Sequence, residues 1–506
     1  MRPNSPRSRR PQTGVAAAPA APADAGLHFG PTGPYEPISA ADADRLVDGA
    51  LRILHESGVV FEAGSEAHAL LRAAGALAAD DGVVRFEPDM VRSTLQTVAK
   101  SVRLWNRPAD RHITLDDRHT WFIPGMTCIK VFDLDSGEPR DSNGEDLATL
   151  ARVADALPNI DAVCVGVKNV ARSTIHGEIE EFAILANHTT KPLEYLCERP
   201  ESLGVVIDMA AQIRGGRQEL FDKPYFLQVI TPLPRNYPAM ASDQIIAAVR
   251  AGVPVSVGTL PIGGASSPIT TAGCLVQSLA TDFAGMVLSQ AVRPGSFCVG
   301  SSDVNFMEPA TGAIGNWAQT CLADMLMCQV RRRLGLPSFT GIGGQSNARR
   351  FNQDAVSEIC NGMLQAFFTR PATLDYLGTL DMGLTFSLQA LLLCDDIAAL
   401  LRTMWAGVPL DDEAMAVDLA IEVGPKRDYL QQKHTVLNCR RNVWASRYFG
   451  ANYPMSNTLL PDRDLGERIE ADLRRILAEH HPAPLDAAVN ARMREIMQRF
   501  ERSFVE

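Results

Sequence analysis

Eight short apolar runs, each followed by a segment with helical periodicity, constrain the fold of this chain more than any other feature. They occupy residues 121–124, 162–168, 192–197, 225–231, 253–259, 297–301, 338–341 and 373–378. Strands that alternate with helices are typical of βαβ units and a parallel sheet, and eight such units are the number at which a parallel sheet closes into a barrel. The sequence therefore predicts an α/β fold, a (β/α)8 TIM barrel at 119–405, with its functional site at the carboxyl ends of the strands.

The rest of the 506 residues lies on either side of this predicted barrel. Residues 1–27 are rich in Pro, Ala and Arg, and they predict a disordered tail because they carry too few large apolar side chains to offset the entropy of ordering. Residues 28–118 predict a helical N-terminal layer, with Ser39 and Ser65 as helix N-caps. Residues 406–506 predict a helical C-terminal extension, with helices at 412–423, 426–438, 464–478 and 485–505.

Composition excludes several classes of protein. The net charge of −11 argues against nucleic acid as a partner, because phosphate binding requires a concentrated basic face. No stretch reaches the roughly 18 uncharged apolar residues of a membrane span, so none is predicted. The pair Arg9-Arg10 lacks the apolar stretch of an export signal, and the ten cysteines stand singly, which is typical of a reducing compartment. We expect a cytoplasmic protein without disulfides.

The common catalytic and metal-binding motifs are missing from the sequence. Gly341-x-Gly343-Gly344 matches neither a dinucleotide fingerprint nor a phosphate-binding loop. His176, His188 and His434 are isolated, and neither H-E-x-x-H nor G-x-S-x-G occurs. No metal site is predicted, and no residue is assigned as a protein nucleophile.

Glycines follow two of the predicted strands. Gly263 and Gly264 come after the fifth strand, and Gly343 and Gly344 come after the seventh. Glycine lets a backbone approach a ligand closely, so these four residues are candidates for contacting a cofactor at the barrel mouth. The alternative for any single loop is that glycine only turns the chain from strand to helix.

Two longer runs and one dipeptide carry a resemblance to a known family. The runs are Leu-Pro-Ile-Gly-Gly-Ala-Ser-Ser-Pro-Ile-Thr-Thr-Ala-Gly at 260–273 and Leu-Gly-Thr-Leu-Asp-Met-Gly-Leu-Thr-Phe-Ser-Leu-Gln-Ala at 377–390, the latter followed by Asp395-Asp396-Ile397; the dipeptide is His434-Thr435. Together they resemble the trimethylamine methyltransferase (MttB-like) family, and the similarity extends in the same order over residues 40–460. The resemblance implies a barrel that moves a methyl group from a methylated amine to the cobalt of a separate corrinoid protein docked over the mouth. It implies no tightly bound cofactor in this chain itself.

One departure from the family narrows the expected substrate. The founding members contain pyrrolysine in the site, and this sequence has none. It is similar instead to the non-pyrrolysine branch, whose members act on quaternary amines such as glycine betaine. A quaternary ammonium leaves as a neutral tertiary amine when it loses a methyl group, so its demethylation needs no additional activating group.

The expected site combines aromatic side chains that surround the ammonium group with polar groups that bind the rest of the substrate. Aromatic faces attract a desolvated cation by about 2 kcal/mol or more, and Tyr195 and Tyr376 are the preferred candidates because a buried phenol needs a polar partner. Other aromatic residues near predicted strand ends, each of which taken alone fits the packed interior better than a cage around the ammonium group, are Trp121, Phe122, Phe306, Phe351 and Phe386. Glu198 is a candidate for balancing the positive charge.

The polar end of the substrate has its own candidates. Ser302, Asp303 and Gln345 are predicted to hold it, and loop N–H groups or Arg349 are the alternatives for a betaine carboxylate. His434 is predicted to reach over the mouth from the C-terminal part as a hydrogen-bond donor.

Two other functions fit the same barrel. One is a non-catalytic barrel that binds betaine-like solutes. The other is a lyase acting on a small carbonyl compound, for which Lys168 is the candidate catalytic amine. The long apolar helices at 275–292 and 388–405 could support a homo-oligomer. The sequence does not identify the amine.

Overall fold

The structure, a computed structural model, describes residues 34–315, 318–340, 343–449 and 464–503. The described residues divide into two units, a larger one formed by residues 34–406 with those described from Ser446 onward, and a smaller one formed by Gly407–Ala445. The predicted tail at 1–27 lies outside the described residues. The described helices of residues 406–506, where the sequence predicts a helical C-terminal extension, fall partly in the smaller unit and partly in the larger one.

All eight predicted strands are present and pair in parallel. They are β6 (Trp121–Pro124), β9 (Val163–Cys164), β10 (Leu193–Leu196), β11 (Phe226–Ile230), β13 (Val255–Val257), β15 (Cys298–Gly300), β18 (Phe339–Thr340) and β19 (Thr373–Leu377). One sheet has the order β15-β13-β11-β10-β9 and the other the order β18-β19-β6, so the last predicted strand pairs with the first. The predicted α/β class is confirmed.

The two sheets are joined at both borders by contacts other than strand ladders. Next to β6, the Asp161 N–H donates to the Phe122 carbonyl at 2.9 Å, and Cys128 forms a parallel bridge with Val167 beyond β9. Between β15 and β18, the guanidinium of Arg331 donates to the carbonyls of Phe339 at 2.8 Å and of Ser302 at 3.3 Å. In the described part of the chain no ladder joins these strands, so the sheets form two parallel arcs.

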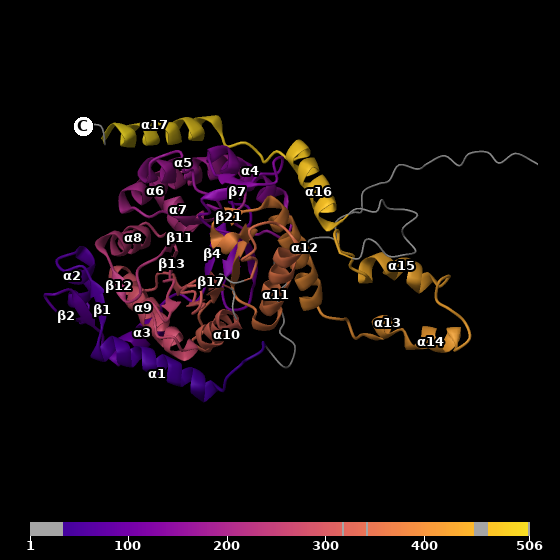
Figure 1. Cartoon of the computed structure of the whole chain (residues 1–506), viewed down its shortest axis with the longest axis horizontal. Coiled ribbons are helices and arrows are strands. Elements are labelled where there is room, and N and C mark those ends of the chain that lie inside the picture. Colours follow the sequence, from indigo (N-terminus) through magenta and orange to yellow (C-terminus); the bar gives the residue numbers. More distant parts are fainter. Residues whose placement is uncertain (1–33, 316–317, 341–342, 450–463, 504–506) are drawn as a thin grey trace, which may run out of the picture. The chain divides into compact units, whose positions relative to one another are not determined.

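Eight helices surround the strands (Figure 1). They are α4 (Gly144–Ala156), α5 (Thr174–His188), α6 (Pro200–Arg214), α8 (Ala239–Arg250), α9 (Thr271–Val292), α10 (Ala318–Arg333), α11 (Gln353–Thr369) and α12 (Leu388–Trp405). Each helix contacts the next one along the chain, and α12 contacts α4, so the helical layer closes on itself. A shorter helix, α7 (Arg217–Asp222), follows α6.

Short strands in the loops after the main strands build a second tier at their carboxyl ends. They are β7 (Lys130–Phe132), β8 (Pro139–Asp141), β14 (Ile262–Gly263), β16 (Asn305–Met307), β17 (Ile314–Gly315), β20 (Thr379–Leu380) and β21 (Thr385–Phe386), with the 3-10 turn η1 (Asp381–Gly383). Strand β14 pairs with β16, and β21 pairs with β7. These pairs tie neighbouring loops together above the strands.

The N-terminal layer is mixed rather than purely helical. It contains α1 (Ala40–Glu56), α2 (Glu66–Ala73), α3 (Pro88–Thr97), the sheet strands β1 (Val59–Phe61), β2 (Leu77–Ala78) and β3 (Val83–Arg85) with β12 (Asn236–Tyr237), and the hairpin of β4 (Val102–Trp105) and β5 (His112–Leu115). The predicted caps are confirmed, because Ser39 Oγ accepts from Asp42 N at 3.1 Å and Ser65 Oγ from His68 N at 3.2 Å. Strands β1 and β3 each begin with two successive valines, whose branched side chains favour extended backbone.

The two longest apolar helices are used inside the larger unit. Helix α9 is long and apolar enough to cross a membrane, but 72% of its most apolar window is buried, and it packs against α1, α3 and α8. Helix α12 buries Leu391, Leu392 and Leu393 completely. Their apolar faces therefore pack within the chain and provide no support for the predicted homo-oligomer.

The C-terminal helices fall into both units. Helix α16 (Leu465–Glu479) packs on α12 and α4, and α17 (Ala487–Ser503) packs on α6 and α5. The smaller unit contains α13 (Asp412–Met415), α14 (Val417–Val423) and α15 (Lys433–Asn442). The single helix predicted at 412–423 is broken at Ala416, whose φ of 49° is left-handed.

Candidate active site

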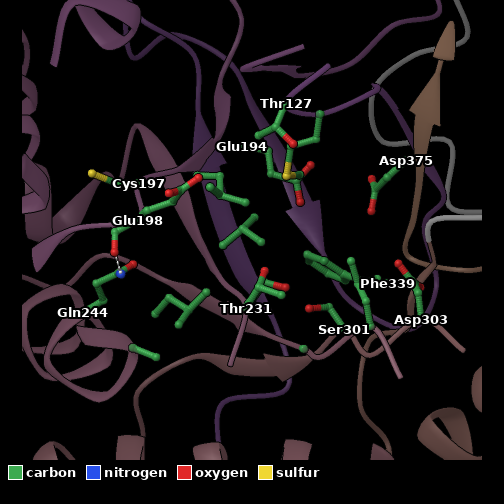
Figure 2. A pocket seen from close by; sticks show the side chains of 18 of the residues that line it. Thr127, Glu194, Cys197, Glu198, Thr231, Gln244, Ser301, Asp303, Phe339 and Asp375 are labelled. Atoms are coloured by element: carbon green, nitrogen blue, oxygen red, sulfur yellow. Dashed lines mark hydrogen bonds between the residues drawn. The ribbon is translucent and has the colours of Figure 1, made fainter. Parts of the chain in front are cut away.

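A cavity of about 550 Å³ opens at the carboxyl ends of the main strands. Residues of β10, β11, β13, β18 and β19 line it, together with residues that directly follow β6 and β15, so both sheets contribute (Figure 2). This is the end of the strands where the sequence predicts the functional site.

Four carboxyl groups line this cavity, and they are those of Glu194, Glu198, Asp303 and Asp375. Glu194 is 3% exposed, Asp375 is 7% and Asp303 is 8%. No Lys, Arg or His occurs among the lining residues within the described ranges. Buried carboxyl groups are costly to ionise when the cavity wall supplies no positive charge, so this arrangement is one that a cationic ligand completes.

The electrostatics of the cavity follow from this crowding of acids. Burial, and then the charge of Asp303, raises the pKa of Glu194 to about 8. Burial, followed by Glu194 and Asp303, raises the pKa of Asp375 well above its usual range, although Thr373 opposes the shift by donating to Asp375 Oδ2 at 3.1 Å. Glu194 Oε2 and Asp375 Oδ1 are buried without a hydrogen-bond partner in the described structure. A positive charge in the cavity would favour the ionised form of both groups.

A bulge in β19 brings two successive residues into the cavity. In a regular strand, successive side chains point to opposite faces, so Asp375 and Tyr376 would not both face inward. The pairing of β19 with β6 shifts register between Leu374 and Leu377, and Tyr376 has a positive φ of 58°. Such backbone strain is typical of functional sites. Burial, and next Asp303 and Asp375, raises the pKa of Tyr376.

A buried ion pair fixes the segment that carries Asp303. Ser302 Oγ donates to Asp282 and accepts from the Thr259 N–H at 3.0 Å, while Arg331 Nη2 donates to Asp282 Oδ2 at 2.9 Å. Ser302 therefore faces the helices, and its neighbours Ser301 and Asp303 line the cavity. The structure does not place Ser302 at the substrate as predicted, because alternation along the chain turns it away.

Tyr195 also points away from the cavity. Its hydroxyl donates to the Glu178 carbonyl, and its ring packs edge-on against Phe182 with centroids 5.3 Å apart. The prediction is corrected by one position, because alternation along β10 turns Glu194 inward and Tyr195 toward α5. An acid inside the apolar run 192–197 is the sequence signal that identifies Glu194, and the same signal identifies Asp375 in 373–378.

The remaining polar candidates have different outcomes. Glu198 lines the cavity, and its carbonyl accepts from Gln244 Nε2 at 2.6 Å (Figure 2). Gln345 forms a bridge with Thr379 and is not among the lining residues. His434 lies in α15 of the smaller unit, so its reach over the mouth stays a prediction.

The four candidate glycines have packing roles. A Cβ on Gly343 would lie 2.3 Å from Leu374 Cδ1, and one on Gly344 would lie 2.2 Å from Leu377 Cδ2. A Cβ on Gly263 would lie 2.6 Å from Phe306, and Gly264 has a φ of 90°. None of the four lines the cavity, so the structure does not bring them to a cofactor.

Basic and aromatic candidates are mostly elsewhere. Lys168 Nζ is paired with Glu181 Oε2 at 2.8 Å and does not line the cavity, so the amine expected of a lyase is not in place. Arg349 is exposed and lies 3.6 Å from Asp381. The aromatic lining residues in the described segments are Phe339 and Tyr376, so the cavity offers carboxylates more than the expected aromatic cage.

Comparisons with known proteins identify the family of this chain. Residues 6–504 match the sequence model of the trimethylamine methyltransferase (MTTB) family. Trimethylamine methyltransferase MttB of Desulfitobacterium hafniense is 25% identical over 434 residues, covering 83% of this chain and 85% of that protein. The MttB of Methanosarcina barkeri is 27% identical over 444 residues, covering 83% and 86%. Glycine betaine methyltransferase of D. hafniense is 23% identical over 466 residues, covering 91% and 96%.

A solved structure shares the fold. The crystal structure of monomethylamine methyltransferase (MtmB) of Methanosarcina barkeri superposes with a TM-score of 0.52 at 11% identity, covering 94% of this chain and 90% of that one. With the family match over nearly the whole length, the conclusion is direct: this chain is a methyltransferase and belongs to the trimethylamine methyltransferase (MTTB) family.

Proposed function

We propose that this protein transfers a methyl group from a methylated ammonium compound to the cobalt of a corrinoid carried by a separate protein. The observation that carries the proposal is the cavity lined by Glu194, Glu198, Asp303 and Asp375 without a lining base among the described residues. Membership of the MTTB family supports the reaction type. The names of the relatives support a methylated amine as the donor.

The fold is proposed to be a (β/α)8 barrel. Eight parallel strands in two arcs, a helical layer that closes from α12 to α4, and one cavity shared by both arcs support it. The similarity to MtmB over most of both chains supports it further. A barrel places ligands at the carboxyl ends of its strands, which is where this cavity lies.

The proposed reaction of a quaternary donor needs no general acid or general base from this chain. A reduced corrinoid supplies a nucleophilic Co(I) whose electron pair forms the new bond to the methyl carbon. The C–N bond breaks with its electron pair on nitrogen, so a quaternary donor leaves as a neutral amine and no proton is required. The chain's own contribution is to bind the cation, exclude water and hold one methyl group toward the opening.

The carboxylates therefore act mainly on binding. The positive charge on nitrogen decreases as the C–N bond breaks, so a nearby carboxylate stabilises the bound substrate at least as much as the transition state. An interaction of this kind lowers KM and does not raise kcat. Glu194 and Asp375 are assigned this binding role.

The opening of the cavity is suited to a protein-borne cofactor. Leu233, Met240 and Leu260 line the cavity and are also between 47% and 56% exposed. Further exposed apolar side chains, Ile129, Ile269 and Leu384, lie in loops on the same side of the strands. We call these six residues the apolar rim, and exposed apolar groups of this kind are typical of protein interfaces.

The test is a reconstituted transfer reaction. Purified protein is mixed with a methylated amine and reduced corrinoid, either free cob(I)alamin or a corrinoid-binding protein, and the amine product is measured by mass spectrometry. We expect an amine that is one methyl group lighter, formed only when all components are present, with a matching change in the visible spectrum of the corrinoid. Failure with every amine of a panel of tertiary and quaternary donors contradicts the proposal.

A further inference from the structure

Charge distribution in the cavity narrows the substrate class beyond the proposed function, on which this inference rests. We infer that the amine held in this cavity is a quaternary ammonium compound whose remaining part carries no carboxylate, of the choline type rather than the betaine type. The acids that favour the ammonium group surround the same cavity that must hold the rest of the molecule.

A betaine would bring a carboxylate among four carboxyl groups. Such a juxtaposition of like charges costs several kcal/mol when no base compensates it. The lining residues of the described segments include no Lys, Arg or His. The net charge of the site therefore favours a ligand that is positive overall and disfavours a zwitterion.

Three bases considered for the site, Lys168, Arg331 and Arg349, are each paired with an acid that does not line the cavity. Lys168 is paired with Glu181 at 2.8 Å, and Arg331 is 2% exposed with its guanidinium bound to Asp282. Arg349 is exposed and lies beside Asp381. None of these cations lines the cavity.

Backbone N–H groups at the strand ends are the other usual ligands for a carboxylate, and in four lining residues they are also occupied. The N–H groups of Thr127, Ser301 and Asp303 donate to the backbone carbonyls of Val165, Val257 and Thr259, respectively. The N–H group of Glu198 donates to the side-chain carboxylate of Glu178. These four backbone N–H groups are therefore not available to a carboxylate.

An uncharged polar tail finds a partner without adding a negative charge to the four carboxyl groups. Ser256 lines the cavity, and its hydroxyl is buried without a hydrogen-bond partner among the described residues. Thr231 and Ser301 line the same cavity. The volume of about 550 Å³ lies in the usual range for small-molecule sites and exceeds the space of a bare trimethylammonium group. Loss of one methyl from choline to Co(I) leaves the neutral amine dimethylaminoethanol, which keeps the electron pair of the broken bond.

Choline and glycine betaine form a matched pair for the test, since they differ by CH2OH against a carboxylate. Calorimetric titration of the whole protein with each compound measures binding without turnover, and transfer to cob(I)alamin measures kcat/KM. We expect choline to bind and react at least about tenfold better than glycine betaine. Glycine betaine that binds as well as or better than choline overturns the inference, and so does failure of both compounds to bind.

Substitutions make the test independent of absolute affinity. Glu198→Gln and Asp303→Asn each remove one acid from the cavity, so we expect the preference for choline over glycine betaine to narrow by about threefold or more. Glu145→Gln, which removes an exposed acid at the start of α4, is the control and leaves the preference unchanged. Circular dichroism verifies that each variant folds, and an unchanged preference in both folded cavity variants contradicts the inference.

The outcomes separate this inference from the proposed function. Transfer from glycine betaine in preference to choline leaves the methyltransfer reaction standing and overturns the inference. Binding of choline in preference to glycine betaine, with no methyl transferred from any amine, supports the inference and contradicts the proposed reaction.

Discussion

Glu194 is the residue on which the proposed cation site depends most. It is buried, carries an acceptor oxygen without a partner in the described structure and faces the cavity with Asp375. We expect Glu194→Gln to raise KM for a quaternary donor by about tenfold or more, since losing a charged partner costs about 1–3 kcal/mol. Because the charge on nitrogen fades in the transition state, kcat should change less than about threefold. Steady-state transfer to cob(I)alamin measures both, with Glu145→Gln as the control, and a fall in kcat at constant KM contradicts the binding role.

The same carboxyl makes binding dependent on pH. The pKa of Glu194 is raised to about 8 by burial and by Asp303, so below pH 8 much of the free protein carries it protonated. A permanent cation prefers the carboxylate, so its Kd should fall as pH rises from 6 toward 8.5, and binding at pH 7 should release protons. Calorimetry in buffers of different ionisation enthalpy measures this release. An affinity independent of pH, or a Glu194→Gln variant with an unchanged pH profile, contradicts the assignment.

The sequence locates these residues only to within one position. The strand at 192–197 is predicted correctly, but the sequence does not show which of its side chains face the cavity. Tyr195 is the predicted site residue, whereas Glu194 lines the cavity. Both faces of β10 are buried, so the hydrophobic pattern does not distinguish the face toward the cavity from the face toward the helices. Asp303, Glu198 and Tyr376 are predicted and line the cavity, because residues just past a strand end are few and all lie near the opening.

Helix α10 offers a test of how the elements around the site are held together. Arg331 joins α10 to α9 through Asp282 and to the carbonyls of Ser302 and Phe339. Arg331→Met leaves a buried carboxylate without its cation, so we expect a loss of about 3–5 kcal/mol in the free energy of unfolding. On the same helix, Arg333 pairs with Asp44 at the surface, and Arg333→Met should cost less than about 1 kcal/mol.

Urea denaturation of both variants gives the comparison. The double variant Arg331→Met with Asp282→Asn should recover part of the loss, because it removes the buried charge as well. Equal effects of Arg331→Met and Arg333→Met contradict the role assigned to the buried pair.

Regular elements are predictable from periodicity, and irregular ones are not. The eight main strands and the caps at Ser39 and Ser65 follow from local pattern. The bulge that turns Asp375 and Tyr376 together into the cavity leaves no pattern in the sequence, because it arises from the pairing of β19 with β6. The glycines at 343 and 344 are misassigned for a related reason, since their neighbours, Leu374 and Leu377, belong to another strand.

At the level of the molecule, sequence periodicity predicts which segments are helices but not what each helix packs against. The C-terminal helices illustrate this limit. Helices α16 and α17 pack on the larger unit, whereas Gly407–Ala445 separates as a unit of its own. The sequence predicts helices in both parts, so it predicts a single helical extension at 406–506. Their division depends on contacts between distant segments.

The apolar rim gives the last prediction, which concerns how two proteins meet. Ile269 and Leu384 belong to the rim but do not line the cavity, so Ile269→Ser and Leu384→Ser alter the approach surface without touching the amine site. We expect the two substitutions together to raise KM for a corrinoid-binding protein by about tenfold, which is the effect of removing an apolar interface anchor.

Free cob(I)alamin separates docking from chemistry, because it reaches the opening without a protein interface. Transfer to free cob(I)alamin, and the Kd for the amine, should change less than about twofold in the same variant. Leu77→Ser, which removes an exposed apolar side chain from β2 in the N-terminal layer, is the control and should affect neither acceptor. If the double rim variant loses activity equally with both acceptors, the rim supports the cavity itself and is not the surface on which the partner docks.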